Sequence, residues 1–322
     1  MSSLLSTLLY IPWFRAEKFT IPGLDFIAIQ PFGLLVATGV ILAIFVGERY
    51  AARHGWSPAI AGSLAMHLVI FGFIGAIVLN TVFYYPERIG VFFERLPGMI
   101  SDFPNSDWSA LPFTGLSSFG GFIGATIGIF YFQKKTQIPF MPVGDAIAFC
   151  FPFGWFFGRM GCFVVHDHPG KETDFFLAVA DYQVGSPPYV PRHDLGLYEV
   201  LWSAAMIALM LYLLPKKRKP GLLVAITPVL YAPIRFFLDY LRIDKVSGGD
   251  ARYFGLTPGQ YSSIAFMILG VWLLRRVLIE PAQEVPESIR WDKDSGKPPP
   301  PPPNVWREAR QKRRAEKKKA QA

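Results

Sequence analysis

The chain has 322 residues, of which 52% are hydrophobic and 17% are charged, and its formal net charge at pH 7 is +8. Soluble domains carry about 25% charged residues, and here the charges cluster between long apolar blocks, which excludes an ordinary soluble domain and predicts a polytopic membrane protein. The positive charge does not indicate a nucleic-acid partner, because it gathers in the C-terminal tail and in short loops, where such clusters set membrane orientation.

About seven apolar segments each approach the roughly 20 residues that cross the hydrocarbon core of a bilayer. They cover residues 26–46, 59–83, 115–132, 144–165, 197–214, 221–241 and 260–279. Because backbone polar groups cannot stay unpaired in lipid, these segments should be helices, and the predicted fold class is an all-α polytopic membrane protein.

Basic residues predict the orientation of these segments. Clusters follow the first, third, fifth and seventh segments, and they include Arg49 and Arg53, Lys134 and Lys135, residues 215–219, and Arg275 and Arg276. With seven spans, all four clusters fall on one side, which the positive-inside tendency assigns to the cytoplasm. The N-terminus is then periplasmic and the C-terminus cytoplasmic.

Two regions are predicted along the chain. Residues 1–280 form the membrane domain, with a periplasmic arm at about 84–114 and a periplasmic loop at about 166–196. The arm is either an amphipathic segment in the headgroup layer or an irregular loop. Residues 281–322 contain a run of prolines and many basic residues, which predicts a disordered linker and a cytoplasmic tail.

Small residues open the third segment. Gly120 and Gly121 allow a neighbouring helix to approach closely, or they line a groove for an acyl chain; the sequence does not separate these alternatives.

Arg159 stands near the outer end of the fourth segment, where a fixed charge requires a reason. It either extends to the interface or binds an anion. Cys150 and Cys162 lie in the same segment, about 18 Å apart if it is helical, so no disulfide joins them.

Titratable residues follow Arg159, namely His166, Asp167 and His168, and later His193. Their spacing matches no metal-ligand motif, so acid–base chemistry is favoured over a metal site. We expect no metal and no cofactor.

The sixth segment carries Tyr231, Arg235, Asp239 and Arg242 at a spacing that puts them on one stripe of a helix. This stripe is either a structural ion-pair ladder or, because two arginines face one aspartate, a phosphate site. Glu199, about one turn inside the fifth segment, can pair with one of these arginines.

Five stretches, in this order, resemble those of the prolipoprotein diacylglyceryl transferase family of bacterial inner membranes. They read SSFGGFIGA, GRMGCFVVHDHPG, PRHDLGLYE, YAPIRFFLDYLR and FGLTPGQYSSI. The resemblance covers most of residues 25–280 and leaves out the tail.

The resemblance implies a bacterial cytoplasmic (inner) membrane enzyme whose partners are phosphatidylglycerol and the signal peptide of a preprolipoprotein. It would transfer the diacylglyceryl group to the lipobox cysteine thiol, form a thioether and release glycerol phosphate. The residues expected to be catalytic are Arg159, Arg235, His166, His168 and Asp167. Those expected to bind substrate are Arg242, Asp239, Tyr231, Glu199, Gly170, Gly120, Gly121 and His193.

Several positions depart from the family pattern. Phe119 stands where the family has a histidine, Phe32 where it has a tyrosine, and Cys162 and Val165 where it has asparagines. His166 or His168 is therefore hypothesised to take over the missing histidine's task. Two alternatives remain open: a diverged, non-catalytic binder of anionic lipid or lipoprotein precursors, and a metal-dependent lipid phosphate hydrolase.

Overall fold

A computed structural model of the chain describes residues 10–13, 16–21, 24–84, 86–102, 117–181, 190–243, 252–292, 294, 300–304, 306–308, 311 and 315. The chain divides into two compact units. The first comprises Met1–Tyr50 and Phe140–Glu284, and the second comprises Ala51–Pro139 and Val285–Ala322.

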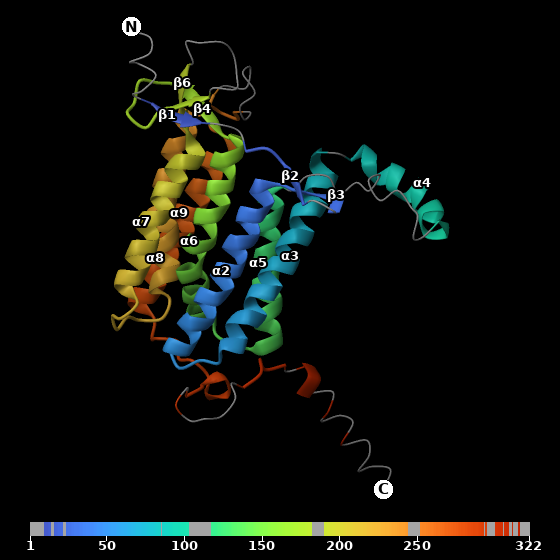
Figure 1. Ribbon diagram of the computed structural model, residues 1–322. Coiled ribbons are helices and arrows are strands. Elements are labelled where there is room, and N and C mark those ends of the chain that lie inside the picture. Colours follow the sequence, from blue (N-terminus) through green and yellow to red (C-terminus); the bar gives the residue numbers. More distant parts are fainter. Residues whose placement is uncertain are drawn as a thin grey trace. The chain divides into compact units, whose positions relative to one another are not determined.

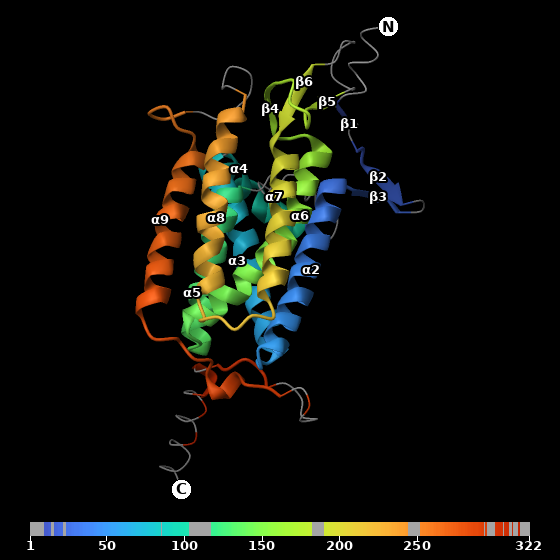
Figure 2. The ribbon, with the colours of Figure 1, turned by 90° about the vertical axis from the view of Figure 1, so that its left-hand side faces the viewer.

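The first unit is built on a bundle of long helices. These are α6 (Phe140–Val165), α7 (Leu195–Leu213), α8 (Leu222–Leu238) and α9 (Pro258–Ile279), together with most of α2 (Pro31–Arg53). A short 3-10 helix, η2 (Asp239–Leu241), extends α8. Helix α6 packs against α7 and α8, and α8 packs against α9, so the four helices from α6 to α9 stand side by side in Figures 1 and 2.

The second unit contains α3 (Pro58–Tyr84), α4 (Glu87–Ser101), α5 (Ser118–Thr136) and the 3-10 helix η4 (Glu287–Ile289). Helices α3 and α5 lie side by side (Figure 1). Their backbones meet at glycines: a Cβ on Gly120 would collide with the Gly75 carbonyl and come within 2.9 Å of Leu79 Cβ. This contact supports the helix-packing interpretation of Gly120.

Six short strands also occur within the described residues, so the prediction of an all-α chain is wrong in this respect. Strands β2 (Phe19–Ile21) and β3 (Leu24–Ile29) form an antiparallel pair. The other sheet has the order β1-β5-β6-β4, from β1 (Ile11–Trp13), β5 (Val179–Asp181), β6 (Pro191–Asp194) and β4 (Pro169–Glu172). Three of the four strands of this sheet come from loop 166–196, and the sheet lies above the end of α6 and the start of α7 in Figure 1.

Within the described residues, each predicted span is helical over most of its length, and the largest difference is at the start of span 26–46. That segment starts as β3, and its helix begins only at Pro31, a residue type favoured at the first helical position. Within the described residues, six helices are long and apolar enough to cross a membrane. They cover Pro31–Arg53, Pro58–Val82, Phe140–Val165, Leu195–Leu213, Leu222–Leu241 and Pro258–Ile279.

Helix α5 occupies the third predicted span but is not among these six. Its 19 residues include the polar end Gln133, Lys134 and Lys135, which lowers its mean hydropathy. The total of seven spans remains a prediction.

The distribution of apolar side chains fits a membrane environment. A small buried core in the first unit joins Met141, Ala225, Leu273 and Val277. Elsewhere on α9, large apolar side chains stay exposed, as at Ile268, which is 65% exposed. Lipid can cover such side chains, whereas water would oppose their exposure.

The beginning of the predicted linker and tail makes contacts within the second unit. The Ser57 amide donates to the Ile289 carbonyl at 2.9 Å, and the Trp291 amide donates to the Gly55 carbonyl at 2.9 Å. Most of residues 293–322 lie outside the described residues, so the predicted disorder of the tail remains a prediction.

Candidate functional site

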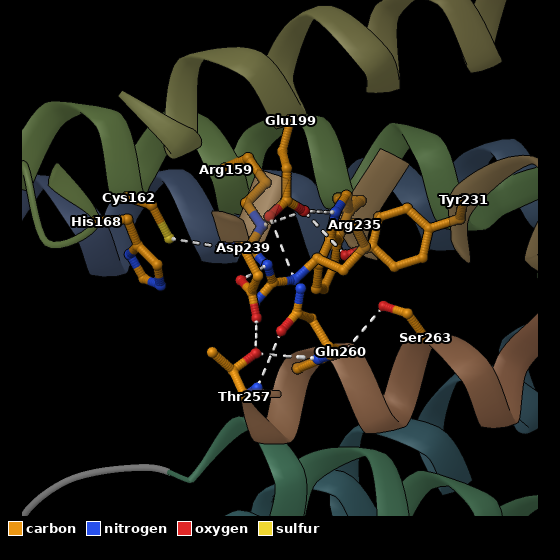
Figure 3. Close-up of polar contacts among 12 residues, drawn as sticks. Arg159, Cys162, His168, Glu199, Tyr231, Arg235, Asp239, Thr257, Gln260 and Ser263 are labelled. Atoms are coloured by element: carbon orange, nitrogen blue, oxygen red, sulfur yellow. Dashed lines mark hydrogen bonds and ion pairs between the residues drawn. The ribbon is translucent and has the colours of Figure 1, made fainter. Parts of the chain in front are cut away.

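A buried carboxylate organises the centre of the site. Glu199 of α7 is 1% exposed. Its Oε2 lies 3.0 Å from Arg159 Nε and accepts hydrogen bonds from Trp155 Nε1 at 3.1 Å and from the Tyr231 hydroxyl at 2.9 Å. Its Oε1 lies 3.8 Å from Arg235 Nε. Glu199 thus brings two arginines from different helices together, as Figure 3 shows.

Arg159 of α6 is held on two further sides. Its guanidinium carbon lies 4.5 Å from the ring centroid of Trp155, a cation–π contact. Its Nη1 lies 3.8 Å from Cys162 Sγ. The arginine is therefore fixed in place rather than extended freely into the interface.

Asp239 anchors the other side of Arg235. Its carboxylate is fully buried and accepts from Arg235 Nη1 and from the Thr257 hydroxyl. Thr257 also caps α9, because its hydroxyl accepts from the Gln260 amide at 3.1 Å while the Gln260 side chain accepts from the Thr257 amide at 3.0 Å. A Cβ on Gly259 would come within 2.9 Å of Arg235 Nη2, so glycine leaves room for this pair.

Arg242 joins the same charged group. Burial, and then the positive charge of Arg235, lower the pKa of Arg242 from its usual value. Its backbone pairs with that of Gly170 in an isolated β-bridge. A Cβ on Gly170 would lie 2.7 Å from both His193 Cβ and the Leu241 carbonyl oxygen. Only glycine therefore lets β4 approach the end of η2, which Arg242 follows.

His166, just after α6, contacts residues of the sheet and the residue that caps α7. Its Nδ1 lies 2.8 Å from Asp194 Oδ2, and its ring centroid lies 4.6 Å from that of Trp13. Asp194 in turn caps α7 by accepting from the Leu197 amide at 2.7 Å. The ring of His166 therefore points to the sheet and the start of α7.

Asp167 and His168 form a second, more exposed group. Their side chains pair with each other and are 41% and 24% exposed. One donor atom each from Cys162, Asp167 and His168 lies within 4.8 Å of the other two. His193, by contrast, contacts the Tyr198 hydroxyl at 2.7 Å, and burial lowers its pKa.

Four further positions were singled out in the sequence: Gly120, Gly121, Phe119 and Phe32. Gly120 and Gly121 belong to the second unit. The side chain of Phe119 lies outside the described part of the chain. Phe32 packs against the backbone of Gly161, where a Cβ would lie 2.9 Å from Phe32 Cδ2.

Four residues of the site were not predicted from the sequence: Trp155, Thr257, Gly259 and Gln260. A signal for Thr257 and Gln260 was present, since Thr-x-x-Gln before an apolar run is a capping box. No sequence pattern indicated Trp155, because it lies on α6 and its hydrogen-bond partner Glu199 lies on α7, far from it in the sequence.

The arrangement suits an anion. Three guanidinium groups, of Arg159, Arg235 and Arg242, interact with two carboxylates, of Glu199 and Asp239. One positive charge remains in excess, and arginine forks match phosphate oxygens well. The ion-pair ladder and the phosphate site are thus two aspects of one arrangement, in which the carboxylates position the arginines.

The sequence matches one family of known proteins over most of its length. A family model described as prolipoprotein diacylglyceryl transferase matches residues 20–276. The phosphatidylglycerol–prolipoprotein diacylglyceryl transferase of Solidesulfovibrio magneticus is 31% identical over 259 residues, which are 78% of this chain and 91% of that protein. The enzyme of the same name from Treponema denticola is 31% identical over 290 residues, covering 76% of this chain and 83% of the relative. The chain, a multi-pass membrane protein, therefore belongs to the prolipoprotein diacylglyceryl transferase family.

Proposed function

We propose that this protein transfers the diacylglyceryl group of phosphatidylglycerol to the lipobox cysteine thiol of preprolipoproteins, forming a thioether and releasing glycerol phosphate. The observation that carries the proposal is the pairing of buried Glu199 with both Arg159 and Arg235, in a chain that belongs to this family of enzymes.

The geometry suits the chemistry of the transfer. The thiolate sulfur attacks the glyceryl carbon that carries the phosphate oxygen, the carbon–oxygen bond breaks, and negative charge grows on the departing phosphate. Arg159, Arg235 and Arg242 oppose that charge with guanidinium groups that are already fixed before reaction. Glu199, Asp239 and Tyr231 position these arginines rather than contacting the reacting atoms.

The thiol must lose its proton, because the thiolate is the reactive form. Of the two histidines considered for this task, His166 is engaged by Asp194 and Trp13. We therefore assign proton handling to the group formed by Cys162, Asp167 and His168. His193 and Gly170 support the site from β6 and β4.

The proposed location is the bacterial cytoplasmic membrane, with about seven spans including α5. The basic clusters at alternate segment ends support a periplasmic N-terminus and a cytoplasmic C-terminus. In this arrangement the arginines lie near the periplasmic surface. Phosphatidylglycerol then enters from the outer leaflet, and the signal peptide arrives from the same side.

The test uses purified full-length protein in phosphatidylglycerol vesicles with a lipobox peptide, followed by mass spectrometry. We expect a diacylglyceryl mass gain that Arg159→Ala and Arg235→Ala abolish. Arg276→Ala is the matched control, because Arg276 pairs with exposed Glu280 on α9, and it should retain the gain.

Two other outcomes would contradict the proposal. A folded preparation that binds phosphatidylglycerol without modifying the peptide would indicate a diverged binder, with Phe32 and Phe119 as the first positions to revert. Release of phosphate or glycerol phosphate without peptide modification would indicate a hydrolase.

A further inference from the structure

Three residues of different chemistry converge where α6 ends. Cys162 Sγ, a carboxylate oxygen of Asp167 and a ring nitrogen of His168 all lie within 4.8 Å of one another. Zinc binds sulfur at about 2.3 Å and nitrogen or oxygen at about 2.0–2.2 Å, so two donors of a tetrahedral site lie about 3.3–3.7 Å apart. To bind one ion, the paired side chains of Asp167 and His168 would separate from each other, and the three donors would turn toward one centre by up to about 1 Å.

The fold holds this group in place from both ends. His166 has a positive φ of 53°, which ends α6 and turns the chain back over its last turn, with the Asp167 amide 3.4 Å from the Cys162 carbonyl. The His166 ring is bound to Asp194, at the start of α7. The carbonyl of His168 accepts from the Leu195 amide at 3.3 Å. The backbone that carries the donors is thus fastened to α7.

The donor set selects the kind of ion. A thiolate sulfur and an imidazole nitrogen suit zinc, whereas magnesium and calcium prefer oxygen alone. Three protein ligands leave a fourth tetrahedral position open, which is typical of catalytic rather than structural zinc sites. The group also touches the anion site, because Cys162 Sγ lies 3.8 Å from Arg159 Nη1. Figure 3 shows Cys162 and His168 on the same side of the arginine group.

We propose that Cys162, Asp167 and His168 form a zinc site and that its fourth position receives the lipobox thiol; the second part rests on the function proposed above. A metal ion that converts the acceptor thiol to a bound thiolate supplies a means of removing its proton.

The proposed transfer step passes through a zinc-bound thiolate. Hydroxide on the zinc takes the thiol proton and leaves as water, and the acceptor sulfur binds the metal as thiolate. Its electron pair forms the bond to the glyceryl carbon, and the pair of the breaking carbon–oxygen bond stays on the phosphate oxygen. Glycerol phosphate leaves from the arginines, the thioether leaves the zinc, and water refills the open position and loses a proton to solvent.

Metal binding is tested without reference to activity. Full-length protein in detergent is stripped with a chelator, loaded with zinc or cobalt(II), and examined by elemental analysis and by absorption spectroscopy. We expect one equivalent of metal, with the visible bands of tetrahedral cobalt and a sulfur-to-cobalt charge-transfer band. Cys162→Ser should lose the charge-transfer band, and His168→Ala should weaken binding at least about tenfold.

Cys150→Ser is the matched control, because Cys150 is the other cysteine of α6, and it should keep the full spectrum. Gel filtration confirms that each variant is folded. The proposal is overturned if wild-type protein binds no metal, or if Cys162→Ser binds it as tightly and with the same spectrum.

Activity then tests the second part separately, with stripped and reloaded protein in phosphatidylglycerol vesicles. Transfer should fall at least about tenfold on stripping and return with one equivalent of zinc. Equal transfer by stripped protein would overturn the thiol role and leave the transferase intact. Absence of transfer in both states would overturn the proposed function, while the cobalt spectrum still decides whether the metal site exists.

Discussion

Glu199 and Arg159 form an ion pair in which Oε2 and Nε are 3.0 Å apart and the two side chains are only 2% and 13% exposed. Breaking a buried pair leaves one charge without compensation, which costs about 3–5 kcal/mol. We therefore expect the carboxylate to help fix the position of Arg159 and to contribute to the stability of the helix bundle.

Replacing Glu199 with glutamine tests this dependence. Glu199→Gln keeps the size of the side chain but removes the charge that faces Arg159 and Arg235. We expect transfer to fall at least about tenfold and the thermal midpoint to drop. Glu172→Gln is the control, since Glu172 is 65% exposed in its pair with Arg192, and it should change stability by less than about 1 kcal/mol. Equal effects of the two substitutions would contradict the central role of Glu199.

The contact between α3 and α5 distinguishes two adjacent glycines. A Cβ on Gly120 would strike the Gly75 backbone, whereas a Cβ on Gly121 would lie 3.9 Å from Ala76 Cβ, an ordinary contact. Gly120→Ala should therefore lower the free energy of unfolding by about 1–3 kcal/mol, and Gly121→Ala should leave it nearly unchanged. Thermal or denaturant unfolding in detergent measures the difference, and similar losses in both variants would be incompatible with this packing.

Thr257 links the cap of α9 to Asp239. Thr257→Val removes the hydroxyl that donates to Asp239 and accepts from the Gln260 amide. We expect a stability loss of about 0.5–2 kcal/mol, as for other helix caps. Transfer should also decrease, because Asp239 is less firmly held against Arg235. Ser262→Ala, which removes a bond only to the Pro258 carbonyl, should preserve both properties, and a comparable loss there would count against the link.

His193 provides a pH prediction. Burial lowers its pKa below the usual value near 6.5, so the unfolded chain binds more protons at this residue near pH 6 than the folded protein does. Its contribution to stability is complete above the unfolded pKa and is lost as pH falls through the lower, folded pKa. We expect the thermal midpoint to fall less between pH 7.5 and pH 5.5 in His193→Gln than in the wild type. A fall of the same size in both would refute this assignment.

Hydrophobic segments of the sequence predicted the helices well, because length and apolar content depend only on local composition. The start of the first span was placed too early, at residue 26 rather than Pro31. Residues 26–29 are apolar and were included in the span, but they belong to β3, which pairs with β2. The partner strand β2 ends at Ile21, just before β3 begins at Leu24, so the pairing is local. Apolar content alone did not reveal it, because a strand and a span can have the same composition.

The site was predicted only in part, because the sequence shows the periodicity of a helix but not where the chain turns. The spacing of Tyr231, Arg235 and Asp239 follows from helix geometry alone, and the structure places all three in one polar group. His166 and His168 are two residues apart, yet one faces Asp194 and the other pairs with Asp167. The positive φ at His166 separates them, and proximity in sequence does not report such a turn.

By itself the sequence determined that the chain is a multi-pass helical protein, because its apolar segments are long enough to cross a membrane. It also showed arginines in those segments, and since a charge in an apolar segment costs free energy, each of them indicates a specific role. Only the tertiary structure decided how those charges are balanced. Asp145 illustrates this: it accepts from the Gly221 amide at 2.8 Å and the Val224 amide at 3.0 Å, and so caps α8 from α6. Like the contact of Glu199 with Arg159, this contact depends on which helices become neighbours, and that is set by packing over the whole chain.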